Sequence, residues 1–149
     1  MKSNIDKINR GKHCHYCNCD TKLVDDKAIY GMNSTYGGMY YRCINNNDHY
    51  VGTYSDNITS LGRVADKELR LLKMQGHKNF DPLWKAKFKY FSSRPEAYQW
   101  LANKMGIDIS VTHFGMFTNE QCKQAVLYCQ QLRNSKMAWV YIIKVRLGL

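Results

Sequence analysis

The sequence predicts an α+β protein in which an N-terminal zinc-ribbon-like module of β-hairpins packs on a C-terminal body of three to four helices. Residues 1–59 are rich in cysteine and turn-forming residues, and they hold short apolar segments of strand length. From residue 60 onward, apolar residues recur at helical spacing and helix-capping motifs occur. We therefore expect two parts, residues 1–59 with an N-terminal arm and residues 60–149.

Four short segments of the first part have the composition of strands, and turn-rich sequence separates them. Side chains alternate along a strand, so Met39, Tyr41 and Cys43 should lie on one face, with Tyr40 and Arg42 on the other. The expected strands are 21–24, 28–31, 39–43 and 50–54, and residues 1–12 are expected to form a polar arm or a frayed helix.

The second part begins with apolar residues at helical spacing from residue 64 to residue 78. Asp81 and Pro82 then mark a new helix, because proline suits the first helical turn. This helix is expected to carry Leu83, Trp84 and Phe88.

Two further helices have clear start signals. Residues 93–96 combine a serine N-cap, a proline in the first turn and a capping-box glutamate, so we expect a helix that runs to Met105 and stops at Gly106. Thr118 and Gln121 form another capping box, which opens a helix to about Arg133. Residues 107–111 and 137–145 are rich in β-branched residues and are candidates for short strands, the second of them C-terminal.

The net charge of +10 is unevenly distributed along the chain. Residues 61–149 carry fifteen basic and six acidic side chains, whereas residues 1–60 carry seven and six. An excess of this sign favours nucleic acid, anionic surfaces or acidic protein partners. The first twelve residues are polar and the longest apolar run is too short to span a bilayer, so we expect a cytoplasmic protein with no membrane partner.

Closely spaced cysteines in a reducing cytoplasm favour a metal site over structural disulfides. Cys14 and Cys17 form a C-x-x-C pair, whose spacing lets both sulfurs reach one tetrahedral ion. Cys43 is the expected third ligand of a structural Zn²⁺ ion and His49 the fourth, with Asp48 as the alternative fourth ligand. Asn18, directly after the pair, is expected to have a left-handed backbone.

Several other thiols and imidazoles have less defined roles. Cys19 is an alternative to one of the chosen ligands, and His13 and His15 are interpreted as neighbours of the site or as solvent-facing residues. Cys122 and Cys129 lie seven residues apart on one face of an expected helix, where packing in the core is the favoured role.

The chain also resembles a known family through a set of short segments. They are Cys14-His15-Tyr16-Cys17, Tyr36-Gly37-Gly38, Tyr50-Val51-Gly52, Leu61-Gly62, Ala65-Asp66, Glu68-Leu69-Arg70, His77, Phe80-Asp81-Pro82-Leu83-Trp84, Ser93-Arg94, Ala97-Tyr98, Trp100-Leu101, His113 and Gly115-Met116-Phe117. This set resembles the bacterial and phage family known as the zinc-finger-containing domain, over roughly residues 12–130. The resemblance implies a zinc-stabilised fold in a bacterial or phage setting, without implying an activity. The family pattern places a fourth cysteine shortly before residues 50–52, where this chain reads Asn45-Asn46-Asn47-Asp48-His49.

The favoured function is a zinc-binding accessory protein that binds DNA or RNA through a basic helical face. At about 100° per residue, Arg63, Arg70, Lys73 and His77 fall within roughly 80° of each other around a helix. Such a face can neutralise phosphates, although a merely solvated helix face has the same pattern. The residues assigned to nucleic-acid binding are Arg42, Arg63, Arg70, Lys73, His77, Lys85 and Lys87.

Two other functions remain open at this stage. One is a zinc-stabilised protein-interaction module, such as a phage factor that modulates a host protein. The less favoured one is nucleotide binding or catalysis around Arg94 and His113, with Tyr98 and Trp100 nearby in the sequence. The chain has no phosphate-binding glycine loop, no H-E-x-x-H motif and no nucleophile elbow, so no catalytic residue is assigned.

Overall fold

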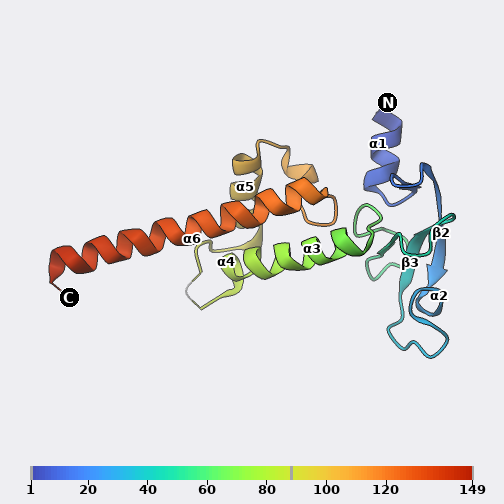
Figure 1. The fold of residues 1–149 in the computed structure, drawn as a ribbon, viewed down its shortest axis with the longest axis horizontal. Helices are drawn as coiled ribbons and strands as arrows, with labels where there is room; N and C mark the ends of the chain where they lie inside the picture. Colours follow the sequence, from blue (N-terminus) through green and yellow to red (C-terminus); the bar gives the residue numbers. More distant parts are fainter. Residues whose placement is uncertain (1, 88, 149) are drawn as a thin grey trace. The chain divides into compact units, whose positions relative to one another are not determined.

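The computed structural model describes residues 2–87 and 89–148, and it has the predicted α+β organisation, with an N-terminal antiparallel sheet and a C-terminal helical region (Figure 1). The chain divides into two compact units. The first unit comprises Met1–Leu71 and Phe114–Phe117, and the second comprises Leu72–His113 and Thr118–Leu149.

A four-stranded antiparallel sheet with the order β1-β2-β3-β4 forms the centre of the first unit. Figure 1 shows β2 and β3 side by side, with α2 at the end of β2. The elements of this unit are α1 (Lys2–Asn9), β1 (His13–Cys14), β2 (Cys19–Asp25), α2 (Asp26–Tyr30), β3 (Met39–Cys43) and β4 (Tyr50–Gly52), followed by the start of α3 (Lys67–Phe80).

One predicted strand, residues 28–31, is wrong, because this segment forms most of α2. The Asp25 side chain accepts a hydrogen bond from the Ala28 backbone N–H and so caps the helix. Gly31, with φ of 100°, ends it. An aspartate cap therefore prevails over the strand-like composition of Ala-Ile-Tyr.

The inner face of the sheet carries the small core of the first unit. Tyr41 and Cys43 are buried on β3, whereas Tyr40 and Arg42 beside them in sequence are partly exposed, so the predicted alternation is confirmed for residues 40–43. Met39, at the start of the strand, is partly exposed. The core cluster consists of Cys14, Tyr41, Cys43, Val51 and Val64, with Cys17 and Cys19 packed against it. The five buried side chains of this cluster give little apolar burial to hold strands of two to seven residues, although Leu69, Phe114 and Phe117 of the same unit are also buried.

A close backbone approach brings the Phe114–Phe117 segment into the first unit. Gly62 has φ of +149°, and a Cβ atom on it would lie 2.0 Å from the carbonyl oxygen of Gly115. The Arg63 N–H donates to the same oxygen at 3.0 Å. A glycine at position 62 is required for this contact, because any Cβ there would clash with the Gly115 backbone. Phe114 and Phe117, on either side of Gly115, are buried.

The remaining helices belong to the second unit, apart from α3, which begins in the first. They are α4 (Pro82–Lys85), α5 (Arg94–Met105), the 3₁₀ turn η1 (Ile109–Val111) and α6 (Asn119–Leu147). Phe80, Leu83 and Leu101 are fully buried, and the rings of Phe80 and Tyr98 lie 4.5 Å apart.

Helix α5 confirms its predicted bounds and caps. The Ser93 hydroxyl accepts from the Glu96 N–H, and Gly106 adopts the left-handed conformation after the last turn. The Glu96 carboxylate accepts from the N–H and hydroxyl of Ser92, one residue before the predicted partner. At the start of α6, Thr118 and Gln121 form the predicted reciprocal capping box.

Other boundaries differ from the prediction. Asp108 accepts from the Ser110 N–H and starts a 3₁₀ turn where residues 107–111 predicted a strand. Residues 137–145 continue α6 instead of forming the C-terminal strand.

Helix α3 starts at Lys67, three residues after Val64, because Asp66 caps it through the Leu69 N–H. Phe88 lies outside the described residues.

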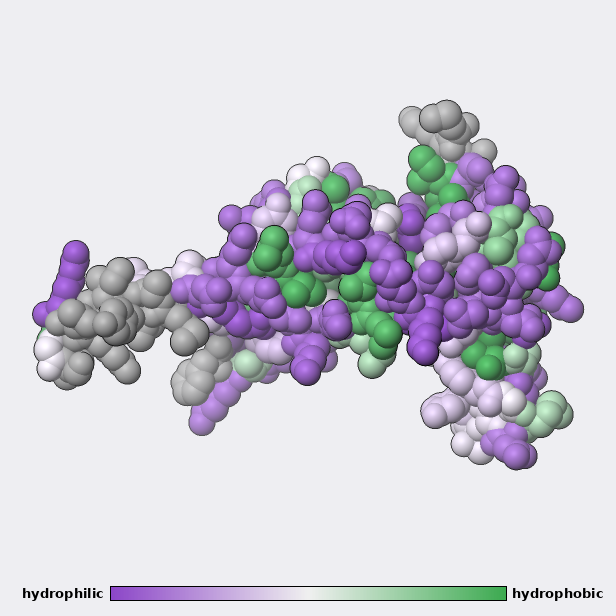
Figure 2. All heavy atoms as spheres, in the orientation of Figure 1, coloured by the Kyte–Doolittle hydropathy of each residue, from purple (hydrophilic) through white to green (hydrophobic). Residues whose placement is uncertain are grey.

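Hydrophilic residues cover most of the surface visible in Figure 2, and hydrophobic residues form small separate patches. Among the residues that the structure describes, no helix is long and apolar enough to cross a bilayer.

Gly62→Ala should destabilise the first unit severely, because the new Cβ meets the Gly115 backbone and the φ angle is unfavourable for alanine. The expected loss in the free energy of unfolding is at least about 3 kcal/mol. Gly106→Ala is the matched control, since φ is +66° there but nothing lies within 4 Å of the added Cβ. Its loss should be about 1–2 kcal/mol. Urea unfolding of both variants gives the comparison, and equal losses would contradict the role of the Gly62–Gly115 approach.

Candidate metal centre

The C-x-x-C pair lies in the tight turn that joins β1 to β2. Cys14 ends β1 and pairs with Cys19 in the antiparallel register. Asn18 has φ of 52°, which is the predicted left-handed conformation, and its side-chain oxygen lies 3.0 Å from Nε2 of His13. This turn holds the Cys14 and Cys17 sulfurs close to the same point.

The second pair of side chains comes from the β3–β4 hairpin. Cys43 ends β3, and its backbone N–H donates to the carbonyl of His49 at 2.9 Å. Nδ1 of His49 lies 3.5 Å from Sγ of both Cys14 and Cys17. The potential ligand atoms of Cys14, Cys17, Cys43 and His49 all lie within 4.8 Å of one another. The four residues selected from the sequence therefore meet at one point.

This donor set fits a zinc ion. Zn–S and Zn–N bonds of about 2.3 and 2.05 Å place sulfur and nitrogen about 3.6 Å apart in a regular tetrahedron. The two measured S···N distances of 3.5 Å match that edge. Three thiols and one imidazole form one of the usual donor sets of structural zinc, and four protein ligands leave no position for water or substrate.

The surroundings of the Cys14 and Cys43 thiols affect how readily each loses its proton to become a thiolate. Burial raises the pKa of Cys14 to about 11, although the backbone N–H groups of Cys17 and Tyr16 partly offset it. Burial also favours the neutral thiol of Cys43, but the backbone N–H groups of Asn45 and Asn46 and the thiols of Cys19 and Cys14 outweigh it, and the pKa falls to about 7. Backbone donors thus approach sulfur in both hairpins, as expected where thiolates form.

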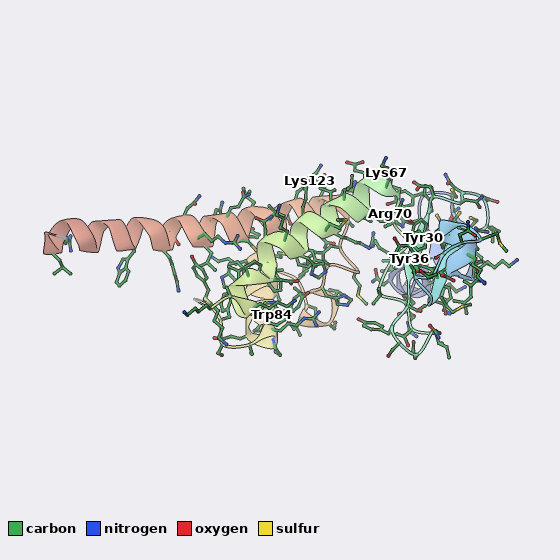
Figure 3. All side chains as sticks on the ribbon, turned by 90° about the horizontal axis from the view of Figure 1, so that it is seen from below. Tyr30, Tyr36, Lys67, Arg70, Trp84 and Lys123 are labelled. Atoms are coloured by element: carbon green, nitrogen blue, oxygen red, sulfur yellow. The ribbon has the colours of Figure 1, made fainter. Side chains whose placement is uncertain are left out.

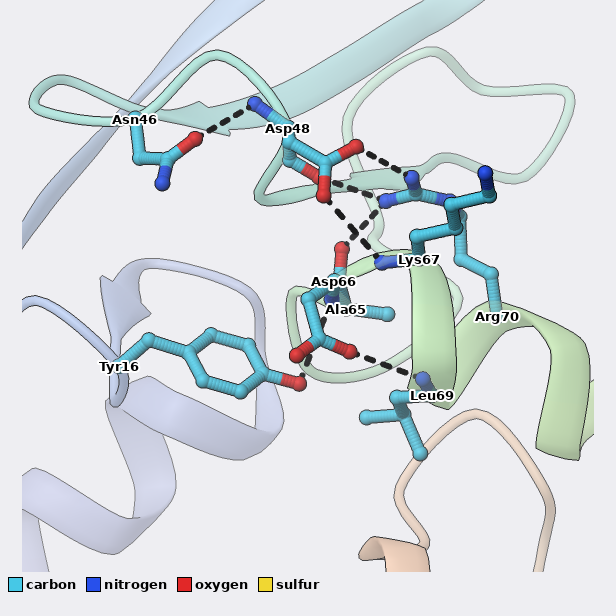
Figure 4. A network of polar contacts seen from close by, with 8 residues as sticks. All are labelled: Tyr16, Asn46, Asp48, Ala65, Asp66, Lys67, Leu69 and Arg70. Carbon is cyan, nitrogen blue, oxygen red and sulfur yellow. Dashed lines mark hydrogen bonds and ion pairs between the residues drawn. The ribbon is translucent and has the colours of Figure 1, made fainter.

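Asp48, the alternative fourth ligand, is engaged elsewhere (Figure 4). Its carboxylate lies 2.6 Å from the Arg70 guanidinium and accepts from the Lys67 N–H at 3.3 Å. Arg70 also donates to the carbonyls of Asp48 and Ala65. The Arg70 guanidinium lowers the pKa of the Asp48 carboxyl. Asp48 therefore joins the ligand loop to the first turn of α3, and the imidazole of His49 faces the sulfurs.

Tyr16 makes a second connection from the centre to α3 (Figure 4). Its ring lies 4.5 Å from that of His49, and its hydroxyl oxygen accepts from the Asp66 N–H at 3.3 Å. Asp66 caps α3 through the Leu69 N–H at 2.8 Å. Sequence spacing does not reveal these two connections, because each joins residues far apart in the chain.

The other cysteines separate into a neighbour of the centre and two core residues. Sγ of Cys19 lies 3.4 Å from Sγ of Cys43. Among the described residues, however, Cys19 is not part of the cluster in which all four potential ligand atoms lie close to one another. Cys122 and Cys129 are fully buried in the second unit, in agreement with the predicted packing role. None of the six cysteines forms a disulfide.

The seven residues assigned to nucleic-acid binding fall into both units. Arg42, Arg63 and Arg70 lie in the first, where Arg42 donates to the Ala28 carbonyl and Arg63 to the Asn9 side chain. Arg63 precedes α3, so it does not belong to the predicted helix face. The other four, Lys73, His77, Lys85 and Lys87, lie in the second unit.

Within the second unit, His77 and Lys85 share one carboxylate. Asp81 lies 3.2 Å from the His77 imidazole and 3.7 Å from the Lys85 ammonium. These three residues line a shallow open pocket together with Lys78, Pro82 and Ala86. Asp81 thus offsets part of the positive charge at this position.

The residues considered for nucleotide binding have a more aromatic setting. The Arg94 guanidinium lies 5.5 Å from the ring centre of Tyr98 and 5.8 Å from that of Trp84. Burial lowers the pKa of His113, and the nearby Arg94 and Lys73 charges add to the effect. A neutral, half-buried His113 fits a structural imidazole.

A comparison with known protein families finds one family that matches most of this chain. The family model described as a zinc-finger-containing domain matches residues 10–132, which include all four clustered side chains. Neither the curated proteins nor the solved structures yield a significant match. Since the family model covers most of the chain, this protein belongs to the family of zinc-finger-containing domain proteins.

Proposed function

We propose that this protein is a zinc-stabilised accessory protein that binds nucleic acid through the basic surface of its helical unit, in a bacterial or phage-infected cytoplasm. The observation that carries the proposal is the charge of the second unit. It holds twelve basic and four acidic side chains, a net charge of +8, whereas the first unit holds ten and eight. Four carboxylates cannot neutralise twelve cations, so the unit has a positive field that attracts an anionic partner.

Zinc has a structural role in this proposal. Cys14, Cys17, Cys43 and His49 hold the ion, and its bonds join the β1–β2 turn to the β3–β4 hairpin. The small core cluster beside the ligands needs such a link, because short hairpins have little independent stability. The ion supplies folding free energy to the first unit and leaves binding to protein side chains.

A second candidate is a protein-interaction module, favoured by a groove in the second unit. It has a volume of about 220 Å³ and lies between α5 and α6. Its lining combines aromatic, apolar and polar side chains, namely Trp100, Lys104, Tyr128, Gln131, Leu132 and Ser135. Grooves of this composition accept an apolar side chain of a partner protein.

The purified protein should contain one zinc ion per chain, and Cys43→Ala should lose it. Removing one of four ligands should weaken zinc binding by more than about 100-fold, because outer-shell changes alone cost 10–100-fold. Cys19→Ala is the matched control, since Cys19 is an adjacent thiol outside the cluster. Elemental analysis after dialysis measures the metal content, and retention of zinc by Cys43→Ala would refute this ligand set.

His49→Ala and Asp48→Asn should separate metal binding from helix anchoring. His49→Ala should lower the zinc content, because Nδ1 of His49 faces the sulfurs. Asp48→Asn should keep the metal but reduce thermal stability, because it weakens the Arg70 ion pair. Zinc titration and thermal unfolding are measured on both variants, and loss of zinc from Asp48→Asn alone would reverse the assignment.

Binding to labelled duplex and single-stranded oligonucleotides should weaken as salt increases, since each neutralised phosphate releases counterions. Lys78→Gln with Lys87→Gln should reduce the salt slope by about one for each phosphate that a removed lysine neutralises. Lys7→Gln with Arg10→Gln is the control, because it removes the same charge from the first unit. Fluorescence anisotropy at several salt concentrations gives the slopes. A stable protein complex without any oligonucleotide binding would instead favour the second candidate.

A further inference from the structure

The outer face of the sheet in the first unit carries aromatic and basic side chains in register. Arg42 pairs with Tyr50 on one neighbouring strand and with Lys22 on the other. Cross-strand partners lie on the same face, so a lysine, an arginine and a tyrosine form one row across three strands. Tyr40, two residues from Arg42, lies on the same face beside Gly52. The buried Tyr41 and Cys43 lie on the opposite face.

Two further tyrosines extend this row into a cluster. The Tyr30 ring centre lies 4.8 Å from that of Tyr36, 5.7 Å from that of Tyr40 and 6.4 Å from that of Tyr50. The ring centres of Tyr40 and Tyr50 lie 6.3 Å apart. Figure 3 shows Tyr30 and Tyr36 close to Arg70 at the start of α3. We call Tyr30, Tyr36, Tyr40 and Tyr50 the tyrosine platform.

The outer rings of the platform are accessible to solvent. Tyrosines that served only as core residues would be covered by other side chains. Tyr36 is 79% exposed and Tyr30 is 48% exposed. The aromatic surface on this side of the sheet is therefore in contact with solvent. Exposed rings grouped on one face are a feature of binding surfaces.

The loop that carries Tyr36 is held in place by a carboxylate. Asp26 accepts hydrogen bonds from the Ser34 hydroxyl at 2.7 Å and from the Gly37 N–H at 2.8 Å. These bonds lower the pKa of Asp26, so the carboxylate stays charged and keeps both donors at neutral pH. Tyr36 lies between the two donors in sequence, so it is both exposed and positioned, which reduces the entropy lost on binding.

The charges around the platform favour an anionic ligand. The nearby carboxylates keep their negative charge while they act within the unit, where Asp26 binds the loop, Asp25 caps α2 and Asp48 pairs with Arg70. The Arg70 guanidinium lies 4.2 Å from the ring centre of Tyr50, and Asp48 balances its charge. Two exposed lysines add positive charge at the edge of the platform, Lys22 on β2 and Lys27 on α2.

We propose that the tyrosine platform stacks the unpaired bases of single-stranded nucleic acid, while Lys22 and Arg42 contact its phosphates. This inference rests on the proposed nucleic-acid function and names the strand state that the protein selects. Stacking on aromatic rings accepts any base, and it requires bases that are not enclosed in a duplex. A neutral peptide would use the rings but not the cations, so the combination favours a polyanion with flat bases.

The test compares labelled oligothymidylate and oligouridylate of about 12 nucleotides, a length within the range of known single-strand sites, with a duplex of equal length. Tyr36→Ala should weaken binding of the single strands by about 5- to 150-fold, the range expected for one base–ring stack, and leave duplex binding unchanged. Tyr36→Phe should retain single-strand binding, because it keeps the ring. Tyr54→Ala is the matched control, since Tyr54 is 52% exposed and is not part of the platform.

A second measurement locates the bound strand directly. Ultraviolet cross-linking to iodouracil-containing single strands, followed by peptide mass spectrometry, should identify the peptides that carry Tyr30 and Tyr36. Single-strand binding that survives Tyr30→Ala and Tyr36→Ala would overturn the platform, and so would an equal loss in Tyr36→Phe. In those cases salt-dependent oligonucleotide binding would persist and the proposed function would stand. Absence of binding to every oligonucleotide, including when a protein partner is found instead, would overturn both.

Discussion

The convergence of Cys14, Cys17, Cys43 and His49 is the constraint on which the first unit depends. The four side chains come from two hairpins, and the buried apolar core beside them consists of few residues. Strands of this length do not hold a sheet together through hydrogen bonds alone. A tetrahedral ion held by these four side chains would join the hairpins at one point, and that link would hold the register of the strands and the orientation of both sheet faces.

The ligand loop also determines where α3 begins. Asp48, directly before His49, accepts from the Lys67 N–H and pairs with Arg70, while Tyr16 of the C-x-x-C turn accepts from the Asp66 N–H. At the N-terminus of α3, the N–H groups of the cap residue Asp66 and of Lys67 are thus satisfied by residues beside the metal centre. Arg70 therefore connects the ligand loop to the helix within the fold. Its position on the predicted basic helix face suggested a phosphate contact, but its guanidinium binds groups of the protein itself.

Local signals explain the parts of the fold that the sequence predicts well. The bounds of β3 follow from alternation, and those of α5 from the Ser93 cap and Gly106, because each signal lies within or beside the element itself. The metal-site residues follow from ligand chemistry and spacing in the same way. Residues 28–31 do not form the predicted strand because one carboxylate caps a competing helix. The Gly62–Gly115 approach joins segments more than fifty residues apart, so it depends on the folded chain and leaves no local pattern.

The metal-ligand cluster and the tyrosine platform proposed for base stacking lie on opposite faces of the same strands. On β3, Cys43 points into the core while its neighbour Arg42 lies on the outer face, and at the start of β4 His49 is followed directly by Tyr50. Because successive side chains alternate, the positions of the ligands fix those of the proposed binding residues one step along the chain. A shift of one residue in the register of either hairpin would move its side chains to the opposite faces. Both the metal-ligand cluster and the tyrosine platform would then be lost. In the proposed function, the zinc ion would therefore act on recognition through the strand register, without touching the nucleic acid itself.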